Sequence, residues 1–263
     1  MSAWRILLTD GLEENGQAIL RQYAQVDERT GITAEELLQV IGEYDAMIVR
    51  GRTKVTAAVF DAGKSLKVVG RAGVGVDNID LNAAKAHGVT VVNSPTATTL
   101  AVAELTLALM LAVVREIPRA DAGMKAGKWL KKEMEVGELW KNTLGVIGFG
   151  RIGAAVAQRA AAFDMNILGY DPLIPAEEIK ARGGQPVSFD ELLAQSDIIT
   201  MHIPLTAESR SLLNADAFAK MKTGVRIICS ARGGVIDEDA LLAALESGKV
   251  AAAGLDVFST EPP

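Results

Sequence analysis

The sequence has few of the residues that form disulfide bonds or metal clusters. Among its 263 residues there is one cysteine, Cys229, and there are two histidines. A single cysteine excludes a disulfide within the chain, which is consistent with a reducing compartment. We predict no metal site.

Long apolar runs are also missing. The apolar run near Met1 is too short for a signal peptide. The longest apolar helix, over 100–114, carries Glu104 and is too short to span a bilayer. The formal net charge of −6 argues against non-specific binding to nucleic acid or to anionic membranes. We predict a cytoplasmic protein whose partner is a small molecule, neither nucleic acid nor membrane.

Hydrophobic residues make up 49% of the chain, and they fall into short strands that alternate with helices. In the first part, strands are expected at 5–9, 46–49, 67–70 and 89–92, and helices at 13–22, 33–41 and 80–87. In the second part, strands are expected at 144–148, 166–170, 197–201, 225–229 and 250–256, and helices at 151–162, 189–195, 214–220 and 237–247. This alternation predicts an α/β fold with two doubly wound parallel sheets.

A break in this pattern at 94–99 predicts the crossing between two domains, which we place at 1–96 and 97–263. The helix that follows, over 100–116, is apolar on nearly every face. A helix of this kind is expected to be buried between domains or subunits.

The most informative stretch is a glycine-rich turn between a strand and a helix. Gly148, Gly150 and Gly153 have the spacing G-x-G-x-x-G, after a β-branched apolar run and before an alanine-rich helix. The first glycine permits a tight turn, the second lets the backbone approach a pyrophosphate, and the third lets the helix pack on the sheet. The helix N-terminus then offers unpaired N–H groups to an anion.

Asp171 ends the next strand, 18 residues after Gly153. This spacing is typical of the carboxylate that binds the adenosine ribose hydroxyls. A carboxylate at this place repels a 2′-phosphate, so the cofactor is predicted to be NAD rather than NADP. The alternative interpretation is a tight strand-to-helix turn followed by an Asp-Pro loop.

Unusual residues follow several other strands. They lie at 70–80, 201–206, 229–234 and 254–258. The carboxyl ends of parallel strands are where open α/β sheets bind ligands, and the first of these segments offers Arg71 and a row of backbone N–H groups there.

Together these segments resemble the D-2-hydroxyacid dehydrogenase family over essentially the whole chain. The matching stretches are 49–55, 70–80, 127–129, 148–153, 170–172, 202–206, 231–237 and 255–262. The resemblance implies a flavodoxin-like substrate domain and a Rossmann NAD-binding domain. It also implies hydride transfer between NAD and C2 of a D-2-hydroxy acid.

The resemblance assigns two catalytic roles. Arg232 is expected to hold the substrate carboxylate and to polarise the C2 oxygen, because a guanidinium grips a carboxylate with two hydrogen bonds. Glu261 is expected to pair with the catalytic imidazole and to raise its pKa.

It also assigns binding roles. Asp256 is expected to bind the nicotinamide carboxamide. The other expected cofactor contacts are Val74, Arg151, Ile152, Ile203, Pro204, Ser230 and Ala231. The substrate-domain side of the site is expected to include Arg50, Arg71, Gly73 and Gly75, where either arginine could instead be a structural ion-pair partner.

The family's acid–base histidine lies beyond its Glu-Pro motif, and we expect this sequence to be a piece of a longer enzyme. His87 is expected at a helix C-terminus, and His202 beside the cofactor. A positioned acid–base group contributes about 10²–10⁴-fold to a rate, so the 263-residue chain is expected to be a poor catalyst.

Three hypotheses remain open from the sequence. The first is NAD-dependent oxidation of D-3-phosphoglycerate to 3-phosphohydroxypyruvate, the entry to serine synthesis. The second is action on another 2-hydroxy acid, such as glycerate/hydroxypyruvate, glyoxylate or lactate. The third is a non-catalytic NAD-sensing protein. The helix over 100–116 resembles the family's dimer-forming element, so a homodimer or higher homo-oligomer is expected.

Overall fold

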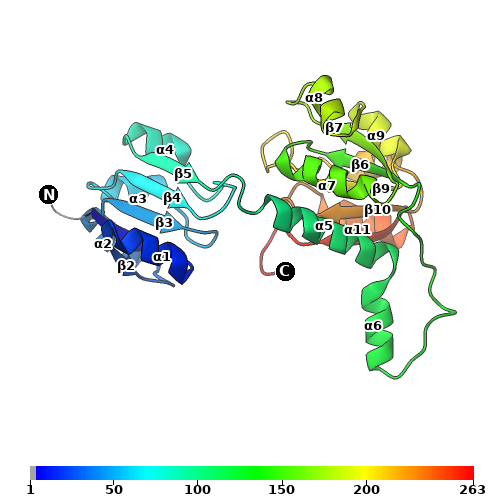
Figure 1. Ribbon diagram of the computed structural model, residues 1–263, viewed down its shortest axis with the longest axis horizontal. Coiled ribbons are helices and arrows are strands. Elements are labelled where there is room, and N and C mark those ends of the chain that lie inside the picture. The colour runs from blue at the N-terminus through cyan, green and yellow to red at the C-terminus, as the bar shows by residue number, and fades with distance from the viewer. Residues whose placement is uncertain (1–3) are drawn as a thin grey trace. The chain divides into compact units, whose positions relative to one another are not determined.

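The computed structural model describes residues 4–263, and the chain divides into two compact units, Met1–Thr98 and Thr99–Pro263 (Figure 1). The first unit holds β1 (Trp4–Leu8), α1 (Glu14–Arg21), β2 (Ala24–Glu28), α2 (Ala34–Val40), the 3₁₀ turn η1 (Ile41–Glu43), β3 (Ala46–Val49), α3 (Ala57–Ala62), β4 (Val68–Arg71), α4 (Leu81–Ala86) and β5 (Thr90–Asn93).

The five strands of the first unit form one parallel sheet in the order β2-β1-β3-β4-β5. This is the flavodoxin-like order 2-1-3-4-5, whose ligand crevice lies where the direction of winding reverses, between β1 and β3. The flavodoxin-like prediction is confirmed. Successive residues of β1 alternate between two cores, with Leu7 facing α2, α3 and α4 while Ile6 and Leu8 face α1.

The second unit begins with α5 (Thr99–Val114) and α6 (Ile117–Lys125). It continues with β6 (Thr143–Ile147), α7 (Arg151–Ala161), β7 (Asn166–Tyr170), α8 (Ala176–Ala181), β8 (Gln185–Pro186), α9 (Phe189–Gln195), β9 (Ile198–Met201), α10 (Ala215–Lys220), β10 (Val225–Cys229), α11 (Glu238–Glu246) and β11 (Val250–Leu255).

Six strands of the second unit form a parallel sheet in the order β11-β10-β9-β6-β7-β8. Read from the other edge, this is the Rossmann order 3-2-1-4-5-6. The prediction of a Rossmann domain is therefore confirmed. The direction of winding reverses between β6 and β9, and a ligand crevice is expected at their carboxyl ends.

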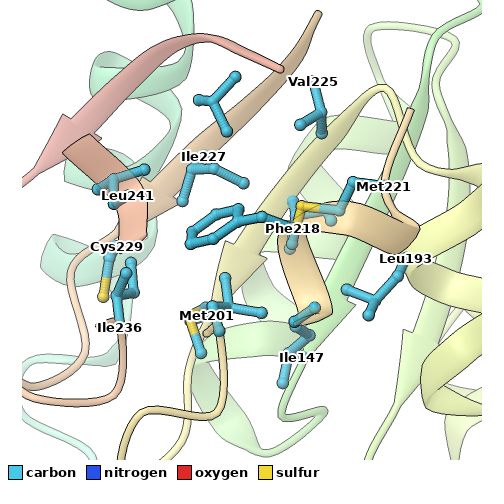
Figure 2. Close-up of a cluster of buried hydrophobic side chains, with 14 of the residues drawn as sticks. Ile147, Leu193, Met201, Phe218, Met221, Val225, Ile227, Cys229, Ile236 and Leu241 are labelled. Carbon is cyan, nitrogen blue, oxygen red and sulfur yellow. The ribbon is translucent and has the colours of Figure 1, made fainter. Parts of the chain in front are cut away.

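Both faces of this sheet are covered. In β10, Ile227 and Cys229 face α9, α10 and α11, while Ile228 between them faces α5 and α7. Figure 2 shows the first of these cores, with the ring of Phe218 pointing toward Ile227. An inner strand such as β10 is thus buried on two sides, which explains why its sequence is largely apolar instead of alternating.

Helix α5 packs on this sheet by only one face. Ala103, Met110 and Val114 are buried, whereas Leu100 and Leu105 are 56% and 38% exposed. The next helix, α6, extends away from the sheet (Figure 1). The exposed apolar face is consistent with an intermolecular contact, and burial against another domain or subunit stays a prediction.

Candidate functional site

The candidate cofactor residues of the second unit all follow carboxyl ends of strands. The glycine turn follows β6, Asp171 follows β7, and the segments that begin at His202, Ser230 and Asp256 follow β9, β10 and β11. Because the strands are parallel neighbours, these segments lie along one edge of the sheet.

Gly148 makes the turn out of β6 with a φ of +89°, a conformation that L-residues with a side chain rarely adopt. A Cβ atom there would lie 2.6 Å from the carbonyl oxygen of His202. The glycine thus lets β6 and β9 approach each other closely at the point where the winding reverses.

The other two glycines differ in their surroundings. A Cβ atom on Gly153 would overlap the carbonyl oxygen of Gly148, so this glycine is needed for the close packing of α7 on β6. A Cβ atom on Gly150 would meet no atom within 4 Å. The space beside Gly150 is open, as the approach of a ligand requires.

Helix α7 begins beside this open space without a side-chain cap. Its first internal bond joins the N–H of Ala154 to the carbonyl of Gly150. The N–H groups of Arg151 and Ile152 precede that bond and have no acceptor in the helix. An uncapped N-terminus with free donors fits a pyrophosphate.

Asp171 is held against the glycine turn. One oxygen of its carboxylate accepts a hydrogen bond of 2.8 Å from the N–H of Phe149, and the other accepts one of 2.9 Å from the N–H of Leu173. Each oxygen keeps a lone pair for a further donor. The carboxylate is therefore both a turn residue and an available acceptor for ribose hydroxyl groups.

His202, Ile203 and Pro204 line the end of β9 next to the glycine turn. The Nε2 atom of His202 lies 3.0 Å from the hydroxyl of Thr200, and burial lowers the pKa of the ring to about 4. The imidazole is therefore neutral near pH 7 and is a weak base.

The segment after β10 carries Arg232. Ser230 and Ala231 are buried, and the guanidinium of Arg232 donates to the carbonyl of Ala231. A Cβ atom on Gly233 would overlap the carbonyl of Phe258, so the segment lies directly against the chain after β11.

Glu261 lies in that chain. Its carboxylate accepts a hydrogen bond of 3.1 Å from the N–H of Phe258, the residue on which Gly233 packs. The structure thus brings the loop of Arg232 and the loop of Glu261 together. Asp256 joins them, because its N–H donates to the carbonyl of Cys229 while its side chain is exposed.

Cys229 is buried, and burial raises the pKa of its thiol. A thiol with a raised pKa is a poor nucleophile at neutral pH. Cys229 is therefore a core residue of the second unit.

In the first unit, the loop after β3 is organised by Asp10. Its carboxylate is 4% exposed and accepts hydrogen bonds from the N–H groups of Arg50 and Thr53 and from the hydroxyl of Thr53. Burial alone would raise the pKa of Asp10, but these hydrogen bonds outweigh it and lower the pKa below its usual value. The carboxylate therefore holds the loop in its charged form.

The two arginines of this loop have different roles. The guanidinium of Arg52 donates to the carbonyl groups of Thr9 and Ile32 and lies 3.1 Å from the carboxylate of Asp10. Arg50 is exposed, and its guanidinium makes no hydrogen bond within residues 4–263. Arg52 therefore supports the loop, and Arg50 is the arginine available to an anion.

Arg71 ends β4, beside β3 in the sheet, where it pairs in register with Val49. Its guanidinium covers Gly73 so closely that any Cβ atom there would displace it. The loop that contains Gly73, Val74 and Gly75 is tied to β5, since Asn93 donates to the carbonyl of Val74 at 2.6 Å. The candidate substrate residues thus lie at neighbouring strand ends.

Sequence reasoning missed two residues that organise these loops. Asp10 is one, and Asn78, which donates to the carbonyl groups of Arg50 and Thr53, is the other. Asp10 directly follows the predicted strand over 5–9, and this place at the carboxyl end of a parallel strand is the sequence signal that could have identified it.

His87 lies away from these loops. It ends α4, its Nδ1 atom lies 2.9 Å from the carbonyl of Ala83, and its Nε2 atom lies 2.9 Å from the carboxylate of Asp61. The prediction of a helix C-terminal residue is confirmed. Within residues 4–263, no three acidic, cysteine or histidine side chains gather as a metal site would require. In the same range, no helix has the length and apolar character to cross a membrane.

The strand order, the glycine turn and the carboxylate after β7 define a dinucleotide-binding domain of the Rossmann class. Comparison with known proteins identifies the family. Residues 107–263 match the D-isomer specific 2-hydroxyacid dehydrogenase family, NAD binding domain. The chain belongs to this family, and NAD is its cofactor.

Among curated relatives, D-3-phosphoglycerate dehydrogenase of Methanocaldococcus jannaschii is 50% identical over 260 residues, which are 98% of this chain and 50% of that protein. Hydroxypyruvate reductase of Thermotoga maritima is 46% identical over 264 residues, 100% of this chain and 85% of that protein. The chain spans about half the length of the curated D-3-phosphoglycerate dehydrogenases that it matches.

Solved structures agree with this assignment. A glyoxylate reductase from Paecilomyes thermophila superposes with a TM-score of 0.92 at 35% identity, covering 100% of this chain and 84% of that one. D-lactate dehydrogenase from Aquifex aeolicus, complexed with NAD and lactic acid, superposes with a TM-score of 0.87 at 34% identity, covering 97% and 78%.

Proposed function

We propose that this protein oxidises D-3-phosphoglycerate to 3-phosphohydroxypyruvate with NAD, the entry to serine synthesis, in the cytoplasm. The observation that carries the proposal is the exposed, uncommitted guanidinium of Arg50 at the end of β3, beside Arg71 at the end of β4. Two cations at neighbouring strand ends suit a substrate that carries a phosphate as well as a carboxylate. The names of several relatives support the same substrate.

The chemistry removes a hydride from C2 and a proton from the C2 hydroxyl, leaving a 2-keto acid. NAD supplies the hydride acceptor. Arg232 would bind the substrate carboxylate and stabilise the negative charge that the C2 oxygen carries once its proton has left and before the hydride has been transferred. The loops of Gly148 and Ser230 hold the cofactor on the sheet edge, and Asp171 selects NAD by accepting from the ribose hydroxyl groups.

Proton transfer is not assigned to either histidine. His87 is held in α4 by Ala83 and Asp61, and the pKa of His202 is about 4. Glu261 lies against the Arg232 loop through Phe258, and its carboxylate is the group proposed to pair with an imidazole there and to raise the pKa of that imidazole. The residues described above bind and orient the substrate and the cofactor.

A second candidate is the reduction of hydroxypyruvate, which lacks the phosphate. Two observations favour it: Arg52 is committed to Thr9 and Ile32, and the match to hydroxypyruvate reductase extends over 85% of that relative. The two candidates differ in whether Arg50 contributes to substrate recognition.

The test is an NADH-oxidation assay with 3-phosphohydroxypyruvate, hydroxypyruvate and glyoxylate, for the unmodified chain and for Arg50→Gln. A hydrogen bond to a charged group contributes about 1.5–3 kcal/mol. Arg50→Gln should therefore lower kcat/KM for the phosphorylated substrate at least about tenfold more than for hydroxypyruvate. Lys64→Gln, a charge change at an exposed position before β4, is the control and should change neither ratio. Equal losses on both substrates would favour the second candidate.

The protein is also proposed to form a homodimer through α5 and α6. Leu100 and Leu105 on α5, and Ile117 and Met124 on α6, are between 38% and 58% exposed, and Trp129 after α6 is 74% exposed. A run of apolar side chains on consecutive elements is typical of an interface between copies.

A further inference from the structure

A buried hydroxyl pair connects the middle of α5 to the segment that carries Arg232. Thr106, on α5, is 0% exposed, and its Oγ1 atom lies 2.8 Å from the Oγ atom of Ser230. The two residues are 124 positions apart in the sequence. Within the described residues, no other side-chain hydrogen bond joins α5 to the end of β10.

The direction of this hydrogen bond follows from the number of protons. Thr106 donates its single hydroxyl proton to the carbonyl of Val102 at 2.8 Å. Ser230 must therefore donate to Thr106. The Ser230 side chain is committed to α5, and its rotamer is fixed by an acceptor that is itself fixed within a helix.

This bond anchors one side of a segment whose other contacts are already described. Cys229 accepts a hydrogen bond from Asp256 on the side of β11, and Gly233 packs on Phe258. Ser230 and Arg232 lie between those two contacts. Among residues 4–263, the bond to Thr106 is the side-chain hydrogen bond that ties the backbone at Ser230 and Ala231 to the face of the sheet that α5 covers.

The position of the segment along the sheet indicates which half of the cofactor it meets. The glycine turn after β6 takes the pyrophosphate, and Asp171 after β7 takes the adenosine ribose. The nicotinamide half must then extend the other way, over β9, β10 and β11. The segment from Ser230 to Arg232 lies there.

We propose that Thr106 is a positioning residue for the nicotinamide half of the site: through Ser230 it fixes the backbone that contacts the cofactor and presents Arg232. This inference rests on the proposed function. A positioning role can be distinguished from a packing role with Thr106→Val, because the added methyl group fills the volume of the hydroxyl while the hydrogen bond to Ser230 is lost.

The experiment compares two ligands on one protein. NADH contacts both halves of the site, whereas ADP-ribose lacks the nicotinamide. Titration calorimetry measures the Kd of each for the unmodified chain, for Thr106→Val, which removes the hydroxyl, and for Thr106→Ser, which keeps it. Ser230→Ala removes the same bond from the other side and serves if Thr106→Val does not fold. Ser196→Ala is the control, a buried hydroxyl before β9 that donates to Leu192.

The proposal predicts that Thr106→Val and Ser230→Ala each weaken NADH binding about fivefold to tenfold, the effect of losing one ordinary hydrogen bond, and leave ADP-ribose binding unchanged. Thr106→Ser and Ser196→Ala should bind both ligands like the unmodified chain. Equal losses for both ligands, or no loss for NADH, would overturn the positioning role. An unmodified chain that is folded but binds neither ligand would instead overturn the proposed function.

Discussion

Alanine at Gly150 and alanine at Gly153 should separate the glycine that serves the ligand from the glycine that serves the fold. A methyl group on Gly150 points into open space, and the φ there is −67°, which other residues adopt. A methyl group on Gly153 overlaps the carbonyl oxygen of Gly148. The two substitutions are chemically identical and lie three positions apart.

The expected changes in stability follow from these surroundings. At an N-cap, glycine is better than alanine by up to about 1 kcal/mol. Removing a glycine lowers the entropy of the unfolded chain, which offsets this loss by about 0.4–1 kcal/mol, so Gly150→Ala should change the unfolding free energy by less than about 1 kcal/mol. Overpacking costs about 1–3 kcal/mol or more. Since α7 is clamped by Val156 and Ala160, both 0% exposed, Gly153→Ala should lower the Tm of this unit by about 4 °C or more.

The affinity for NADH, unlike the stability, should depend on Gly150. The methyl group of Gly150→Ala occupies the approach of the pyrophosphate to the free N–H groups of α7, and one lost hydrogen bond to a charged group costs about 1.5–3 kcal/mol. Gly150→Ala should therefore bind NADH at least about tenfold more weakly while melting normally. Calorimetry and thermal unfolding measure the two effects. Undiminished NADH binding by Gly150→Ala, or an unchanged Tm for Gly153→Ala, would refute this reasoning.

Three further predictions follow from the contacts. Folding lowers the pKa of His202 from 6.5 to about 4, so the unfolded chain binds more protons than the folded chain at pH values between these two. The free energy of unfolding is therefore highest well above pH 6.5 and is lower by about 2 kcal/mol at pH 5. His202→Gln should remove this difference when urea unfolding is compared at pH 5 and pH 7.5. Leu105→Glu on exposed α5 should convert a dimer into a monomer in analytical ultracentrifugation. Asp10→Asn should weaken the loop after β3, shown by faster amide exchange at Arg50 and Thr53.

Each of these has an outcome that contradicts it. A pH dependence that persists in His202→Gln would mean that other groups carry it. A monomeric unmodified chain would remove the dimer proposal, and Leu81→Glu, exposed on α4, is the matched control. Unchanged exchange in Asp10→Asn would mean that Asn78 alone holds the loop.

The strands whose two faces are both buried were predictable from the sequence. The strands over 46–49, 166–170 and 225–229 have the bounds that their apolar runs indicate, because burial on two sides demands continuous apolar residues. The polar edge strand β2, Ala-Gln-Val-Asp-Glu, was missed, since it is only partly buried and its pattern resembles a loop.

The same distinction applies to the site. The glycine turn was readable because its requirements are local: one turn, one approach and one helix contact within a few residues. Asp10 and Thr106 were not, because their partners Arg50 and Ser230 are 40 and 124 positions away. A hydroxyl in an apolar helix carries no local signal of the strand end that it will meet.

The most direct test of the account is calorimetric titration of the folded 263-residue chain with NADH and NADPH, repeated with Asp171→Ala and with the exposed control Asp216→Ala. The account predicts that NADH binds the unmodified chain more tightly than NADPH does. It predicts that Asp171→Ala weakens NADH at least about tenfold, with a smaller loss for NADPH, because the carboxylate accepts from the ribose and repels a 2′-phosphate. NADH binding that Asp171→Ala leaves unchanged would contradict the account and leave the glycine stretch a turn between a strand and a helix.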